Sequence, residues 1–168
     1  MSADPLAARL KELLLSEPRL TVAAAESLTA GLVQARLASV SGASGYFLGG
    51  LTAYTLEQKV KRLGVNRTHA RQVNCVSQRV AVEMAAGAVE LFGADLAVAT
   101  TGYAEPAPAF GVAVPLAWWA VCHRHRGGKL AVLSGEVEVP RASRTTVQSR
   151  VAETALRGLA AYLQDWRG

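Results

Sequence analysis

The stretch that most constrains the fold is Ala23–Leu32, where an apolar segment passes through a polar turn into a helix. Residues 20–25 are nearly all apolar and predict a short buried strand, and residues 29–38 have helical spacing. Ser27 lies between them, beside the unpaired backbone N–H groups at the positive end of a helix. Such a serine is either a nucleophile with oxyanion donors close by or an ordinary helix cap.

The rest of the chain alternates helices and strands. Helices are predicted at 5–16, 29–38 and 56–63, in a short turn after Asn66, from Ser77 to Gly93 and from Pro140 to about Trp166; strands are predicted at 20–25, 46–54, 95–101, 116–122 and 129–139. This order predicts an α/β fold, a three-layer α/β/α sandwich with parallel crossovers first and a hairpin at one edge of a mixed sheet. At 168 residues, we expect a single domain over 1–168.

Composition limits the classes of function. The chain is 51% hydrophobic and 18% charged, which excludes disorder, and its apolar runs are too short to span a membrane. The N-terminus lacks the pattern of a signal peptide, so we expect a cytoplasmic protein. The net charge of +5 is spread along the chain without interleaved aromatics, which disfavours nucleic acid and leaves anionic small molecules as plausible partners.

The sequence gives little support for a metal site. Cys75 and Cys122 lie far apart and form no ligand pattern, so we expect both to be reduced. His123 and His125 flank an arginine with no third candidate ligand nearby, and we assign them to an exposed turn. No metal and no cofactor are expected.

Two residues after the second predicted strand can serve Ser27. Tyr54 ends that strand and Lys59 lies early in the next helix, at a junction that can face the same sheet edge as Ser27. A lysine kept neutral by burial can act as a base for a serine, with a tyrosine hydroxyl relaying or orienting the proton. A solvated Lys59 and a Tyr54 packed in the core are the structural alternatives, and spacing alone does not decide between them.

Several segments together resemble the CinA C-terminal family, the nicotinamide-mononucleotide deamidases. Residues 26–31 resemble the family's Glu-Ser-Cys-Thr-Gly-Gly signature, and four further segments follow in the family's order over nearly the full length. These are Gly42–Gly50, Ala53–Val65, Val76–Ala88 and Ala94–Gly102.

The resemblance implies a reaction and its residues. Family members hydrolyse the carboxamide of nicotinamide mononucleotide, a pyridine nucleotide, to nicotinate mononucleotide and ammonia without a metal, and they associate as homo-oligomers. The matching catalytic residues are Ser27 as nucleophile with Lys59 and Tyr54 assisting it. Substrate contacts are assigned to Glu26, Thr29, Ala30, Gly31, Thr101, Gly102 and Arg141, with the backbone N–H groups of 29–31 as oxyanion donors and Arg141 as a phosphate contact.

The chain departs from the family pattern around this site. Leu28 and Ala30 replace a cysteine and a glycine, and an alanine is costly if that position needs a positive φ. In the loop at residues 103–115, Glu105 replaces a glycine and most of a glycine run is lost, and Pro115-Leu116 at its end replaces a Gly-Thr pair. The pattern suits either an amidohydrolase with altered substrate choice or a catalytically silent paralogue that binds a nucleotide or only self-assembles.

Overall fold

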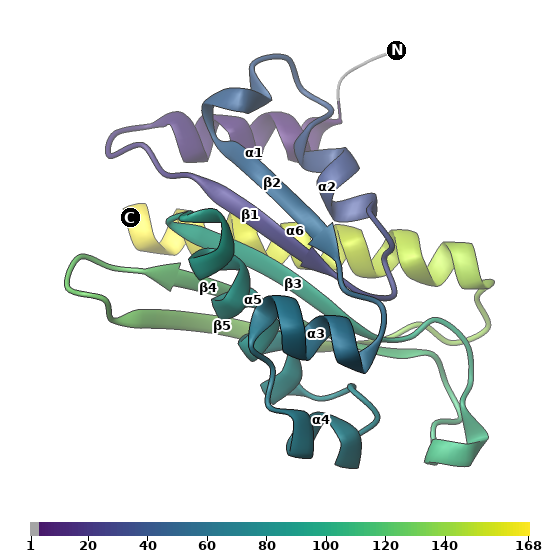
Figure 1. Ribbon diagram of the computed structural model, residues 1–168. Coiled ribbons are helices and arrows are strands. Elements are labelled where there is room, and N and C mark those ends of the chain that lie inside the picture. Colours follow the sequence, from purple (N-terminus) through teal and green to yellow (C-terminus); the bar gives the residue numbers. More distant parts are fainter. Residues whose placement is uncertain (1–3) are drawn as a thin grey trace.

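In a computed structural model, which describes residues 4–168, a five-stranded sheet lies between two layers of helices (Figure 1). The helices are α1 (Pro5–Leu15), α2 (Leu32–Leu37), α3 (Leu56–Leu63), α4 (Arg67–Gln72), α5 (Gln78–Phe92) and α6 (Arg144–Arg167), with short 3-10 turns η1 (Ala43–Gly45) and η2 (Pro108–Phe110). The strands are β1 (Val22–Glu26), β2 (Phe47–Thr52), β3 (Leu96–Tyr103), β4 (Leu116–Arg124) and β5 (Leu130–Glu138).

The strand order is β2-β1-β3-β4-β5. Strand β1 runs parallel to both of its neighbours, whereas β4 is antiparallel to β3 and to β5. The predicted α/β class, with parallel crossovers and a hairpin at one edge, is therefore confirmed. Because β1, β2 and β3 are parallel, the segments that follow their carboxyl ends meet at one edge of the sheet.

The two faces of the sheet bury separate cores. Val22 and Ala24 of β1 pack with α1, α2 and α6, whereas Ala23 and Ala25 face α5. In Figure 1, α3, α4 and α5 lie on the near side of the sheet and α6 runs behind it. Trp118 and Trp119 divide in the same way, one indole against each core, so neither is left as a free contact surface.

Two helices begin later than predicted, for backbone reasons. Arg141 has φ +55°, which a right-handed helix cannot contain, so α6 begins at Arg144 and not at Pro140, with the Ser143 hydroxyl capping the Thr146 N–H. Ala30 (φ +52°) and Gly31 (φ +105°) are also left-handed, and they delay α2 to Leu32.

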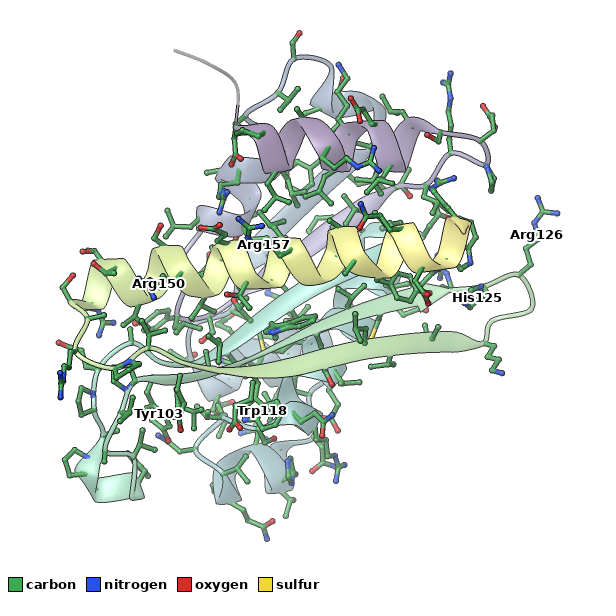
Figure 2. The ribbon with its side chains drawn as sticks, turned by 180° about the vertical axis from the view of Figure 1, so that it is seen from behind. Tyr103, Trp118, His125, Arg126, Arg150 and Arg157 are labelled. Carbon is green, nitrogen blue, oxygen red and sulfur yellow. The ribbon has the colours of Figure 1, made fainter. Side chains whose placement is uncertain are left out.

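The expectation of an exposed turn at His123 is wrong. His123 lies in β4 and is only 2% exposed, with Nδ1 2.9 Å from the Tyr162 hydroxyl and its ring against His125. The turn comes later, at Gly127-Gly128, and Arg126 beside it points away from the body of the molecule (Figure 2). None of the helices within residues 4–168 is long and apolar enough to cross a membrane.

Candidate active site

Ser27 and Lys59 lie in contact at the edge where the parallel strands end. Ser27 follows β1 directly and is 7% exposed; Lys59 lies in the first turns of α3 and is 1% exposed. Lys59 Nζ is 2.9 Å from Ser27 Oγ, 2.8 Å from the Ala53 carbonyl oxygen and 3.2 Å from the Tyr54 carbonyl oxygen. The solvated alternative for Lys59 is therefore excluded.

These three contacts can be made by either protonation state of Lys59. A charged ammonium donates to all three oxygens, Ser27 Oγ included. A neutral amine has two N–H donors and one lone pair, and the two carbonyl oxygens can only accept, so they take the N–H groups. The lone pair then remains for the proton of the Ser27 hydroxyl. Burial lowers the pKa of Lys59, and this outweighs the opposing electrostatic effect of the neighbouring Cys75. Burial likewise raises the pKa of Cys75, so the thiol stays neutral more readily beside this amine.

A cavity of about 480 Å³ opens beside the pair. Ser27 and Lys59 line it together with segments from β3, from the turn after α4 and from the start of α6. A volume of this size accommodates a small organic molecule, and convergent polar groups in such a cavity are typical of a substrate site. In Figure 2, Tyr103, which lines the cavity, lies at the end of the sheet opposite the hairpin tip that carries Arg126.

Three polar side chains join across the exposed side of the cavity. The Arg144 guanidinium donates from Nη1 to Glu105 Oε2 and from Nη2 to Tyr54 Oη, each at 2.7 Å. All three residues line the cavity and all three are exposed. Tyr54 is 52% exposed, which excludes core packing as its role. Its hydroxyl is engaged by Arg144, and its contact with Lys59 is through the main-chain carbonyl.

The sequence and fold were compared with known proteins. A profile described as the CinA C-terminal domain matches residues 3–163, almost the whole chain. The chain belongs to the CinA C-terminal domain family.

Relatives by sequence agree with this assignment. A CinA-like protein from Chlorobium limicola is 38% identical over 153 residues, and one from Chlorobaculum tepidum is 40% identical over 162 residues. Each alignment covers 90% of this chain but only 35% and 36% of those relatives, so the chain spans about a third of the length of the curated relatives it matches.

Solved CinA-family structures share the fold. A competence damage-inducible protein A from Klebsiella pneumoniae superposes with a TM-score of 0.86 at 26% identity, covering 96% of both chains. A competence/damage inducible protein from Agrobacterium tumefaciens gives 0.82 at 29% identity, covering 98% of this chain and 99% of its own.

Glu26, assigned to substrate contact, has a different place in this CinA-family chain. Its carboxylate is fully buried and accepts hydrogen bonds from the Gly31, Val33 and Gln34 N–H groups at 2.9–3.1 Å. It therefore caps α2, where a negative charge also complements the helix dipole. Glu26 is not among the residues that line the cavity.

The expected set of three oxyanion donors is reduced in the structure. The Ala30 N–H donates to the Ser27 carbonyl and the Gly31 N–H to Glu26, so both are engaged. Within residues 4–168, only the Thr29 N–H of this set has no hydrogen-bond partner. The Thr29 hydroxyl is buried against the Thr100 hydroxyl at 2.7 Å, and residues 29–31 do not line the cavity.

Thr101 and Gly102 do line the cavity, as expected of substrate contacts. Each also has a structural task. The Thr101 hydroxyl donates to the Cys75 carbonyl at 2.7 Å and holds a strained segment in which Asn74 and Cys75 both have positive φ. Gly102 lies so close to β4 that an added Cβ would come within 2.5 Å of Ala117 Cα.

Arg144 occupies the place expected for Arg141. Arg141 is exposed in the left-handed turn before α6 and does not line the cavity, whereas Arg144, the first residue of α6, does. The late start of the helix shifts the arginine by three positions, and a recognised Ser143 cap would have revealed this. Asn74 and Cys75 also line the cavity, and no local pattern in the sequence marks them.

The loop at residues 103–115 lies partly in the cavity wall. Residues 103–107 line the cavity, whereas Pro115 is buried at the base of the hairpin, where its carbonyl accepts the Val139 N–H. The replacement of a Gly-Thr pair by Pro115-Leu116 therefore affects the hairpin more than the cavity. Within this loop, Glu105 is the departure that reaches the cavity, and Leu28, which stands in place of the family's cysteine, also lines it.

Proposed function

We propose that the chain is an amidohydrolase of the nicotinamide-nucleotide deamidase type, acting on nicotinamide mononucleotide or a related carboxamide. The observation that carries this proposal is the buried Lys59 Nζ, 2.9 Å from Ser27 Oγ and held by two main-chain carbonyls. Membership of the CinA C-terminal domain family supports it. A serine with a neutral lysine beside it is an activated nucleophile for acyl transfer.

The proposed reaction has two stages. Ser27 Oγ attacks the carboxamide carbon while Lys59 accepts the hydroxyl proton, which gives a tetrahedral oxyanion. The intermediate collapses as Lys59 returns that proton to the departing nitrogen. Ammonia is released, and the acyl group stays on Ser27 as an ester. Lys59 then takes a proton from a water molecule, which attacks the ester carbon. As the bond from that carbon to Ser27 Oγ breaks, Lys59 returns the proton to Oγ, and the product leaves as the acid and ionises to the carboxylate.

The surroundings of Ser27 suggest how the oxyanion is stabilised. Of the expected set, the Thr29 N–H is the candidate donor, because the Ala30 and Gly31 N–H groups are already engaged; Thr29 itself does not line the cavity, so this donor serves only an oxyanion drawn in beside Ser27. One such donor typically contributes about 3–4 kcal/mol to transition-state stabilisation. The Gln148 side chain donates to the Leu28 carbonyl at 2.8 Å and so ties the turn to α6.

The test is ammonia release from nicotinamide mononucleotide by the wild type, Ser27→Ala and a matched Ser149→Ala control. Ser149 is an exposed serine on α6 that does not line the cavity. Wild type and Ser149→Ala are expected to turn over, and Ser27→Ala is expected to lose activity by a factor of about 10³ or more.

The silent-paralogue alternative gives a different result. It predicts no turnover by the wild type together with saturable binding of the nucleotide in a calorimetric titration. Equal turnover by wild type and Ser27→Ala would contradict the serine mechanism while leaving an enzyme of another kind.

A further inference from the structure

The polar groups on the exposed side of the cavity point to the charge of the substrate. Glu105 is the only carboxylate among the residues of the described chain that line the cavity, and Arg144 and Lys59 are its only basic residues. With Lys59 neutral, as the serine mechanism requires, Arg144 and Glu105 cancel. The lining then carries no net positive charge to offer a phosphate.

Two of the five N–H donors of the Arg144 guanidinium are also occupied. A guanidinium binds phosphate best through two parallel N–H groups. In Arg144, Nη1 donates to Glu105 and Nη2 donates to the Tyr54 hydroxyl. A phosphate that took these two donors would displace Glu105, and one that bound through the remaining N–H groups of Arg144 would lie close to the Glu105 carboxylate.

The main chain next to Glu105 offers no replacement. Pro106 follows directly in the cavity wall and has no N–H to donate. A loop that binds phosphate through consecutive backbone N–H groups cannot form across a proline. Glu105 and Pro106 therefore act in the same direction.

We propose that Glu105, paired with Arg144, selects against a phosphate group, so that this site takes an unphosphorylated pyridine-carboxamide nucleoside in preference to its 5′-phosphate. This inference rests on the proposed amide hydrolysis and names its substrate class. The pyridinium ring of such a nucleoside is a cation, which the Glu105 carboxylate does not repel, whereas that carboxylate repels a phosphate dianion at close range.

Two substrates that differ only by the phosphate test this: nicotinamide riboside and nicotinamide mononucleotide. The variants are wild type, Glu105→Gln and Glu153→Gln. Glu153 forms a matched exposed pair with Arg157, also at 2.7 Å, on α6 and outside the cavity. Steady-state ammonia release gives kcat/KM for each substrate and each variant.

Wild type is expected to have the higher kcat/KM for the riboside. Glu105→Gln removes a negative charge a few ångströms from the phosphate dianion in a partly exposed site. It is therefore expected to raise kcat/KM for the mononucleotide about tenfold and to change kcat/KM for the riboside less than about twofold. Added salt should shrink the difference between wild type and Glu105→Gln on the mononucleotide. Glu153→Gln should leave the ratio of the kcat/KM values for the two substrates unchanged. A wild-type preference for the mononucleotide, or a Glu105→Gln variant that leaves the ratio unchanged, would overturn the proposal.

A binding measurement separates this inference from the hydrolysis itself. If the wild type releases ammonia from neither substrate, the proposed hydrolase function fails, and calorimetry on wild type and Glu105→Gln decides the inference alone. Tighter binding of the riboside by the wild type, with the mononucleotide gaining in Glu105→Gln, would support it. Tighter binding of the mononucleotide by the wild type, or binding of neither compound, would contradict it.

Discussion

At the scale of single residues, Lys59 carries the proposed chemistry. It lies 2.9 Å from Ser27 Oγ, and burial lowers its pKa. Lys59→Met is expected to reduce kcat by a factor of about 10²–10⁴, the usual contribution of a general base, while the protein stays folded because methionine suits a buried site. Ammonia release and a denaturant unfolding curve for each protein measure the two effects.

The pH dependence of the wild type gives a second test of Lys59. Because the base is the unprotonated amine, kcat/KM should rise with pH and level off above the pKa of Lys59. Since burial lowers that pKa, the midpoint of the rise should lie below the ordinary lysine value of 10.5. A kcat/KM that does not vary across this limb would contradict the assignment of Lys59 as the base.

Tyr54 is assigned a catalytic role by resemblance, but its hydroxyl is occupied by Arg144 at 2.7 Å. We therefore expect Tyr54→Phe to lower kcat less than about tenfold, well short of a proton-transfer group. Stopped or continuous ammonia assays at saturating substrate would measure this. A loss of a hundredfold or more would mean that Tyr54 leaves Arg144 during turnover and reaches the reacting groups.

At the scale of elements, the turn between β1 and α2 stores backbone strain. Ala30 has φ +52°, a conformation that costs a residue with a Cβ about 1 kcal/mol. Ala30→Gly is therefore expected to raise the free energy of unfolding by about 0.5–1 kcal/mol in urea titrations, with little change in activity.

A control for this prediction lies in α2, the helix that follows Ala30. Ala35 is exposed in the interior of α2, where glycine costs about 1 kcal/mol relative to alanine, so Ala35→Gly should destabilise. If both glycine variants lower stability equally, the left-handed geometry at Ala30 contributes nothing that glycine relieves.

Sequence patterns predict most of the elements and the pair of residues, Ser27 and Lys59, on which the proposed chemistry rests. Ser27 and Lys59 are accessible to prediction because each lies at a strand-to-helix junction and the parallel sheet brings the two junctions to one edge. Arg144 is not predicted because the left-handed backbone at Arg141 delays the start of α6. The sign of the backbone angle φ cannot be read from hydrophobic periodicity. Asn74 and Cys75 reach the cavity through a strained turn that only tertiary contacts specify.

At the scale of the whole molecule, the end of the sheet far from the cavity contains a buried titratable group. His123 is 2% exposed, and its pKa is lowered to about 4 by burial first and then by the charges of His125 and Arg167, against the opposing effect of Asp95. His125 lies at the hairpin end of the sheet in Figure 2, opposite Tyr103. Titration of His123 is therefore separate from the chemistry of Ser27.

This shift makes the stability of the fold pH-dependent. The unfolded chain binds a proton at His123 below about pH 6.5, whereas the folded chain does so only near pH 4, so stability falls as pH decreases between these values. The expected loss from this group is about 3 kcal/mol. Unfolding curves for wild type and His123→Asn at several pH values measure this loss. The difference in the free energy of unfolding between the two proteins should shrink as the pH falls. A difference independent of pH would contradict it.

Self-association of the whole molecule stays a prediction. The edge strand β5 exposes Leu130, Val132 and Leu133, and an edge strand carries unpaired main-chain groups that can pair with another chain. Light scattering on the purified protein would give its mass in solution.

The central claim is that Ser27 carries the acyl group during turnover. Its most direct measurement is intact-protein mass spectrometry after acid quench during the reaction with nicotinamide riboside or its 5′-phosphate, followed by peptide mapping. The account predicts a covalent increment equal to the acyl group, mapped to Ser27 and absent from Ser27→Ala. Ammonia release by the wild type with the increment on Cys75 would contradict it. So would ammonia release with no increment on the protein and no hydroxamate formed when hydroxylamine is added.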